Sequence, residues 1–177
     1  MLKCVFFDRD GIVNRSPGPG YVERWDDFHL LPEFVDSLRI ARNLGYVAVV
    51  ITNQRGIAVG CMTTASVEDI HQRLRAELKD QHGLDLLDIL YCPHDRDDGC
   101  DCRKPKPGMI REAARRHGID LTQSWMIGDS HKDVEAGHSA GCRTVWVSTK
   151  ATLGPADFVF TDMAALRDGI AKLLESK

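Results

Sequence analysis

The hydrophobic residues of this chain fall into two kinds of pattern that alternate along the sequence. Short, largely apolar runs predict six strands, at Lys3–Asp8, Tyr46–Thr52, Asp88–Cys92, Trp125–Gly128, Arg143–Val147 and Phe158–Phe160. Apolar residues with helical spacing predict five helices, at Pro32–Leu44, Ser66–His82, Pro107–Arg116, Lys132–Ala140 and Met163–Leu174. This alternation predicts an α/β fold, a Rossmann-like three-layer sandwich with a parallel sheet between helices.

Polar and small residues mark the expected helix ends. Ser66 is a candidate N-cap for the second helix. Pro107 suits the first turn of the third helix, because a missing backbone N–H costs nothing there. Gly45 and Gly141 follow the first and fourth helical patterns as stop signals.

Length and composition indicate one globular domain over residues 1–177. Of the 177 residues, 43% are hydrophobic and 28% are charged, which argues against disorder. The net charge of −3 argues against a polybasic nucleic-acid binder. No apolar window reaches the roughly 18 residues of a membrane span. We therefore expect a cytoplasmic monomer with no membrane or nucleic-acid partner, whose six cysteines are not paired in disulfides.

Candidate chemistry lies just after the predicted strands, where α/β sheets bind ligands. Asp8 and Asp10 follow the first strand within Asp-Arg-Asp-Gly. One carboxylate can attack phosphorus or hold a cation, while the other exchanges a proton with a leaving oxygen. The alternative is a solvated polar turn.

Three further strand ends carry groups that suit a phosphate and a hard cation. Thr52-Asn53-Gln54 offers hydrogen-bond donors to an anion, and the alternative is a helix N-cap. Asp129 and Asp133 can complete a Mg²⁺ site, or cap a helix. Lys104 stands in Arg-Lys-Pro-Lys-Pro-Gly, where the prolines restrict the backbone around it. A positioned ammonium there can neutralise a phosphoryl group, and the alternative is a solvated basic loop.

Three cysteines and one histidine crowd into a short polar loop. Four ligands of this kind suit a tetrahedral structural zinc site, which would order a loop that lacks core-forming residues. The alternative is chance clustering of free thiols. The four candidate ligands are Cys92, His94, Cys100 and Cys102.

The order of these strand-end motifs resembles that of the haloacid dehalogenase superfamily of phosphotransferases, over about residues 3–148. Asp8–Gly11, Thr52–Gln54 and Cys102–Met109 resemble its heptose-bisphosphate and histidinol-phosphate phosphatase branch, which is capless and often carries a zinc loop. The resemblance implies a Mg²⁺-dependent phosphatase acting on a sugar phosphate, and a place in carbohydrate metabolism such as lipopolysaccharide biosynthesis.

The resemblance also implies a role for each matching residue. Asp8 would form an aspartyl-phosphate, and Asp10 would protonate the leaving alkoxide and then activate water. Thr52 and Lys104 would hold the phosphoryl oxygens. Mg²⁺ would be held by Asp8, the backbone carbonyl of Asp10 and Asp129, with Asp133 beside it or one layer behind.

The substrate that the resemblance favours is D-glycero-D-manno-heptose 1,7-bisphosphate, cleaved at the 7-position. Arg55 departs from the small residue usual in heptose phosphatases, and its guanidinium would either clasp a second phosphate or exclude the usual sugar. The substrate contacts it implies are Ser16, Asn53, Gln54, Arg55 and Arg103.

Three other functions stay open at this point. A histidinol-phosphate phosphatase belongs to the same branch. A polynucleotide 3′-phosphatase shares the Asp-x-Asp chemistry, but strand binding needs clustered basic and aromatic residues that this chain lacks. A zinc-stabilised interaction module without turnover would not need the acids and the lysine described above.

Overall fold

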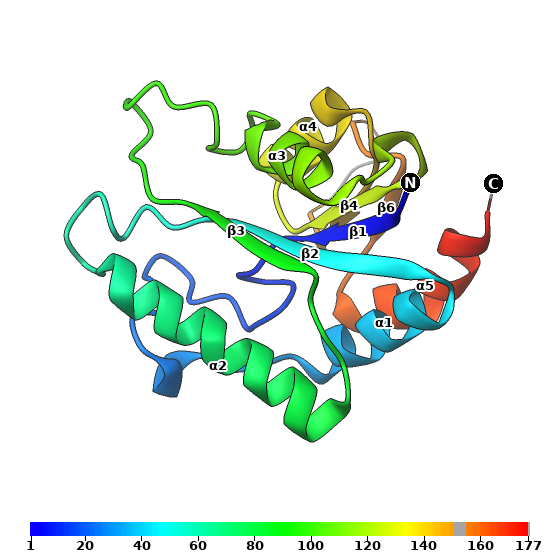
Figure 1. Cartoon of the computed structure of the whole chain (residues 1–177), viewed down its shortest axis with the longest axis horizontal. Coiled ribbons are helices and arrows are strands. Elements are labelled where there is room, and N and C mark those ends of the chain that lie inside the picture. The colour runs from blue at the N-terminus through cyan, green and yellow to red at the C-terminus, as the bar shows by residue number, and fades with distance from the viewer. Residues whose placement is uncertain (151–154, 177) are drawn as a thin grey trace.

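A computed structural model describes residues 1–150 and 155–176, and its core is one parallel sheet (Figure 1). The strand order is β3-β2-β1-β4-β5-β6, and every neighbouring pair runs parallel. The six strands are β1 (Lys3–Phe7), β2 (Tyr46–Asn53), β3 (Asp88–Cys92), β4 (Trp125–Gly128), β5 (Arg143–Val147) and β6 (Phe158–Phe160).

Helices cover both faces of this sheet. On one face lie α1 (Pro32–Asn43), α2 (Thr64–His82) and α5 (Met163–Glu175); on the other lie α3 (Gly108–His117) and α4 (His131–Ala140) (Figure 1). Short 3₁₀ turns occur at Trp25–Asp27 and Leu121–Gln123. The three-layer α/β sandwich predicted from the sequence is therefore confirmed.

Side-chain alternation along the central strands explains why both faces need a helical cover. Val5 and Phe7 of β1 join the hydrophobic cluster beneath α1, α2 and α5. Cys4 and Phe6 point the other way, into the cluster beneath α3 and α4. All four are fully buried. A strand whose side chains are apolar on both faces is stable only where both faces of the sheet are covered.

Two of the expected helix starts are wrong. Thr63, not Ser66, is the N-cap of α2, and the Ser66 hydroxyl oxygen accepts a hydrogen bond from the Thr63 backbone N–H at 3.1 Å. This reciprocal pair allows the helix to begin at Thr64. Pro107 is the N-cap of α3 and lies outside the first turn.

The connections after β1, β2 and β3 contain no inserted domain, which agrees with the expected capless fold, and residues 8–31 join β1 to α1. Residues 54–63 join β2 to α2, and residues 93–107 join β3 to α3. Both loops project from the same end of the sheet (Figure 1). Among the described residues, no helix is long and apolar enough to cross a membrane.

We predict that Gly137→Ala destabilises the protein, although alanine normally favours a helix interior. A Cβ at this position in α4 would lie 2.7 Å from both Met126 and Thr144, on the strands beneath. Overpacking of this kind costs about 1–3 kcal/mol. The melting temperature should fall by roughly 2–10 °C. Ser139→Ala, at an exposed position of the same helix, is the control and should leave it unchanged or slightly raised.

Candidate active site

A cleft of about 270 Å³ opens at the carboxyl ends of the central strands. Lys132 and Asp133, at the start of α4, complete its charged lining. The sheet thus brings together side chains from five separate segments of the chain. The proposed site residues that line the cleft are Asp8, Asp10, Ser16, Thr52, Asn53, Arg103, Lys104 and Asp129.

The ammonium of Lys104 lies at the floor of the cleft, and its side chain is only 3% exposed. Its Nζ lies 2.7 Å from Asp8 Oδ1 and 2.6 Å from Asp133 Oδ1, and it donates to the Ile51 carbonyl at 3.0 Å. Burial alone would lower the pKa of Lys104, but the charges of Asp133 and Asp8 outweigh burial and raise it. The two carboxylates therefore stabilise Lys104 as a buried cation.

Asn53 places this lysine by holding its backbone. The Asn53 side-chain amide donates to the Lys104 carbonyl at 3.0 Å and accepts from the Lys104 N–H at 3.0 Å. Asn53 ends β2, so the two hydrogen bonds fix the basic loop against a central strand. Near this clamp, the buried Thr52 side chain lies with its hydroxyl 2.8 Å from the Gln54 amide.

Three carboxylates crowd around the lysine and have room for a cation. Oxygens of Asp8, Asp129 and Asp133 all lie within 4.8 Å of one another. Burial and the charge of Asp133 raise the pKa of Asp8, and the same two causes raise the pKa of Asp129 to about 6. One ammonium cannot balance three carboxylates, so these residues fit a divalent cation such as Mg²⁺.

Asp10 is held from beneath by two buried residues that the sequence analysis did not propose. Arg9 donates from Nη2 to both Asp10 oxygens, at 3.0 and 3.1 Å, and Asn14 donates to Oδ1 at 3.0 Å. Neither Arg9 nor Asn14 is exposed at all. The position of Arg9 between two aspartates could have indicated from the sequence that it contacts one of them. No pattern in the sequence pointed to Asn14.

Two of the proposed substrate contacts lie elsewhere. Gln54 is 2% exposed and lies against Arg9 beneath the cleft. Arg55 pairs with Asp95 of the cysteine-containing loop, at 2.6 Å from Nε to Oδ1. This ion pair holds the pKa of Asp95 at about 2. The loops that follow β2 and β3 are therefore linked by an ion pair. Arg55, which the resemblance suggested could bind a second phosphate, is one partner of this pair.

The four candidate zinc ligands do lie together. Cys92 Sγ lies 3.7 Å from Cys100 Sγ and 3.5 Å from His94 Nδ1, which is 3.2 Å from Cys102 Sγ. A tetrahedral zinc ion with bonds of about 2.3 Å to sulfur and 2.0–2.1 Å to nitrogen places its ligands roughly 3.5–3.8 Å apart. All six cysteines are unpaired. The donor set and spacing thus fit zinc.

The cysteine-containing loop makes hydrogen bonds with the two basic residues on either side of Lys104. Arg103 donates to the His94 carbonyl at 3.0 Å. Lys106 donates to the Cys100 carbonyl at 2.7 Å. Any change in the order of this loop therefore reaches the segment that carries Lys104.

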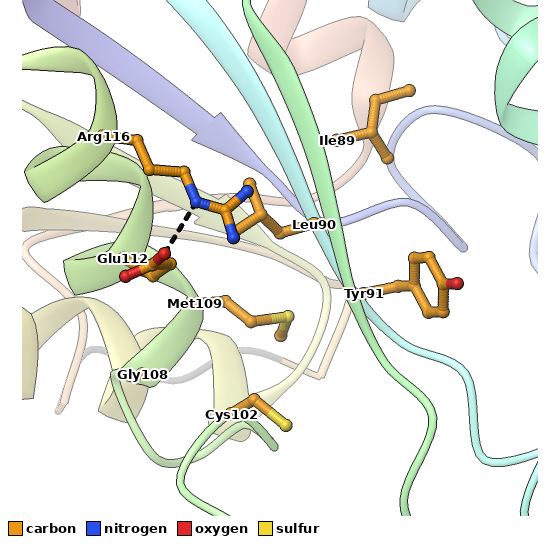
Figure 2. A pocket seen from close by; sticks show the side chains of 8 residues that line it. All are labelled: Ile89, Leu90, Tyr91, Cys102, Gly108, Met109, Glu112 and Arg116. Atoms are coloured by element: carbon orange, nitrogen blue, oxygen red, sulfur yellow. Dashed lines mark hydrogen bonds and ion pairs between the residues drawn. The ribbon is translucent and has the colours of Figure 1, made fainter. Parts of the chain in front are cut away.

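A second hollow, of about 310 Å³, lies between β3 and α3 (Figure 2). The Leu90 and Met109 side chains face it, and the Glu112–Arg116 ion pair lies at its edge (Figure 2). Ile89 and Tyr91 border it from β3, but their side chains lie on the other side of that strand (Figure 2). Of the proposed site residues only Cys102 borders it. The reactive groups converge on the cleft and not on this hollow.

Comparison with known proteins agrees with the chemistry of the cleft. A HAD-hydrolase-like family model matches residues 101–164. The chain is 38% identical over 173 residues to the D-glycero-beta-D-manno-heptose-1,7-bisphosphate 7-phosphatase of Pseudomonas aeruginosa, covering 94% of this chain and 96% of that protein. It is 34% identical over 166 residues to an alpha-anomer 7-phosphatase of Mycobacterium bovis, covering 90% and 87%.

A crystal structure extends this similarity to three dimensions. The D,D-heptose 1,7-bisphosphate phosphatase from B. bronchiseptica, complexed with magnesium and phosphate, aligns with a TM-score of 0.86 and 33% identity. The alignment covers 97% of this chain and 99% of that one. Similarity of this extent, together with the cleft described above, shows that the chain belongs to the heptose-1,7-bisphosphate 7-phosphatase family of HAD-like phosphatases.

Proposed function

We propose that the protein removes the 7-phosphate of D-glycero-D-manno-heptose 1,7-bisphosphate through a phosphorylated Asp8. The observation that carries this proposal is the buried Lys104 ammonium between Asp8 and Asp133, beside Asp129. That arrangement leaves one oxygen of Asp8 for attack. With Mg²⁺ held by the carboxylates, it would place the ion and the Lys104 ammonium beside the incoming phosphoryl group. The names of the relatives support heptose over histidinol phosphate.

In the first step, a carboxylate oxygen of Asp8 attacks phosphorus, and the bond from phosphorus to the sugar oxygen breaks. Asp8 Oδ1 already accepts from Lys104 and from the Arg9 backbone N–H, at 2.7 Å each, so the other oxygen is the nucleophile. Asp10 gives its proton to the departing sugar oxygen. Thr52 and Lys104 hold the phosphoryl oxygens during the transfer.

In the second step, water attacks phosphorus and the bond to Asp8 breaks, which releases inorganic phosphate. Asp10, now a carboxylate, takes the proton from this water and returns to its starting form. Asp8 and Asp129, with the backbone carbonyl of Asp10, would hold Mg²⁺, which neutralises the charge of the phosphoryl oxygens. Asp133 would hold the Lys104 ammonium in position through their ion pair.

A basic recess beside the cleft supports a substrate with two phosphates. This recess, of about 330 Å³, is lined by Arg96, Arg103, Lys104, Lys106 and Lys132, and by no acidic residue. Arg103, Lys104 and Lys132 line both the recess and the cleft. With Arg55 paired to Asp95, we assign the second phosphate to Arg103 and Lys132.

We also propose that zinc orders the cysteine-containing loop and that the whole chain acts as a single-domain monomer in the cytoplasm. The zinc proposal rests on the spacing of the four ligands. The loop offers no apolar residue between His94 and Cys100, so hydrophobic packing does not order it. Zinc would then fix Arg103 and Lys104 indirectly.

Asp8→Asn should abolish Mg²⁺-dependent release of phosphate, because the amide is not a nucleophile. We expect heptose 1,7-bisphosphate to give a higher kcat/KM than heptose 7-phosphate, histidinol phosphate or a 3′-phosphorylated oligonucleotide, measured with a phosphate assay. Asp85→Asn, at a side chain 80% exposed, is the control and should keep full activity. Turnover by Asp8→Asn at the wild-type rate would refute the proposal.

The stabilisation of the protein by Mg²⁺ should increase with pH. The folded-state pKa of Asp129 is about 6 and the unfolded value is about 4, so the metal-free fold loses stability as pH rises through this range. Mg²⁺ binds the ionised carboxylates. At about 100 times its Kd, we expect a melting-temperature gain of roughly 5 °C or more near pH 8, and a smaller gain near pH 5.5.

Differential scanning fluorimetry with and without Mg²⁺ measures this difference. Asp129→Asn should abolish most of the gain, whereas Asp85→Asn should keep it. An equal gain at both pH values would show that these carboxylates do not bind the ion.

Purified protein should contain one zinc per chain by elemental analysis. Cys100→Ser should remove it and lower both the melting temperature and kcat/KM, the latter by about tenfold or more, because a disordered loop releases Arg103 and Lys104. Cys61→Ser, at an exposed cysteine outside the cluster, should change neither. Loss of zinc with unchanged activity and melting temperature would contradict the assigned role.

A further inference from the structure

Arg9 is a charged side chain in an unusual place. It is fully buried, yet it lies between Asp8 and Asp10 in the sequence, directly beneath the cleft. A buried guanidinium is stable only where its N–H groups have partners. The identity of those partners therefore indicates what this arginine does.

Most of its donors are directed at Asp10. Nε lies 3.2 Å from Oδ1, and Nη2 lies 3.0 Å from Oδ1 and 3.1 Å from Oδ2. This two-pronged contact fixes the plane of the carboxylate as well as its position. A lysine at this position could supply the charge but not the planar fork.

The other end of the guanidinium is anchored to the fold. Nη1 lies 3.4 Å from Nε2 of His71, on α2, and 3.1 Å from the oxygen of Gln54 when that amide is turned to face the donors. Burial and the charge of Arg9 lower the pKa of His71 to about 3, so the ring is neutral and Nε2 accepts. Arg9 is thus held from α2 and from the loop after β2.

Asn14 adds a third donor to the same carboxylate oxygen. Its Nδ2 donates to Asp10 Oδ1 at 3.0 Å and to the Arg15 carbonyl at 2.9 Å. Turning the amide over would place its oxygen against two acceptors, so the orientation is fixed. Oδ1 of Asp10 receives three N–H donors, from Arg9 Nε, Arg9 Nη2 and Asn14. Oδ2 receives one, from Arg9 Nη2, and lies 3.3 Å from the Gln54 amide, which presents its oxygen there when it is turned to face Arg9.

We propose that Arg9 is a positioning residue that, with Asn14, saturates Oδ1 of Asp10 and presents Oδ2 as the oxygen that gives and takes the proton. A carboxyl group needs a lone pair free of N–H donors to carry a proton, and with the Gln54 amide turned toward Arg9 the contacts leave one on Oδ2. The inference rests on the proposed acid and base role of Asp10. The inference adds to that role the identity of the Asp10 oxygen that carries the proton. It also adds the buried residues that hold Asp10 in place, from His71 on α2 through Arg9.

The leaving group of the substrate provides a sharp test. A sugar alkoxide leaves from phosphorus only if Asp10 protonates it, whereas nitrophenolate is a stable anion that leaves without a proton. The ratio kcat/KM reports the steps up to phosphorylation of Asp8. Arg9→Lys and Arg9→Met should therefore lower kcat/KM for heptose 1,7-bisphosphate about 100-fold, and for p-nitrophenyl phosphate less than about threefold.

The second step gives an independent readout with the same variants. Asp10 must also take a proton from water, so loss of its orientation slows hydrolysis of the phosphorylated Asp8. With p-nitrophenyl phosphate, rapid mixing should show a burst of nitrophenolate equal to the enzyme concentration, followed by slow turnover. Equal losses of kcat/KM for both substrates, with no burst, would show that Arg9 only supports the fold and would overturn the proposal.

Three further variants complete the test. Asp10→Asn should show the same difference between substrates. If Asp10→Asn shows no difference between the two substrates, the proposed role of Asp10 itself is wrong. If Asp10→Asn shows the difference and the Arg9 variants do not, only the inference about Arg9 is overturned. Should the Arg9 variants fail to fold, Asn14→Ala must show the same selective loss on the heptose substrate. Arg24→Met, at an exposed arginine, is the control and should match the wild type.

Discussion

The cleft depends on one buried cation held among more negative charge than it can neutralise. Lys104 contacts Asp8 and Asp133, and Asp129 lies within reach of both carboxylates. Like charges at these distances are unfavourable in a buried site unless a cation joins them. The lysine relieves part of that repulsion and a divalent ion would relieve the rest. This deficit of positive charge favours binding of a divalent cation, which together with Lys104 would neutralise a bound phosphoryl group.

The parallel sheet explains how these groups meet. β1 lies between β2 and β4, and the three strands run parallel, so Asp8, Thr52 and Asp129 meet in one cleft at their carboxyl ends. Lys104 lies on a loop, and its backbone makes two hydrogen bonds with the Asn53 side chain, which hold the loop against β2. Strand ends therefore supply the reactive carboxylates, and a clamped loop supplies the cation.

A lower layer supports the cleft and an outer layer surrounds it. Beneath the cleft, Arg9, Asn14, Gln54 and His71 form a buried polar network in which Asp10 is the part that faces the cleft. Around it, the loops that follow β2 and β3 are joined by the Arg55–Asp95 ion pair. In our proposal, the lower layer orients Asp10 for proton transfer, and the outer layer shapes the part of the cleft that receives the sugar phosphate.

The sequence by itself determined the layered fold, the six strands and the residue types at each strand end, because hydrophobic periodicity and strand-end chemistry are local properties. It also predicted the four residues that meet in the cysteine-containing loop, since they lie within eleven positions of one another. Only the tertiary structure decided the partners of the long polar side chains. Arg55 meets Asp95 across 40 positions, Asn53 meets Lys104 across 51 and Arg9 meets His71 across 62. Such pairs depend on how loops and helices settle on the sheet, and a flexible side chain gives no local sign of which distant partner it will reach.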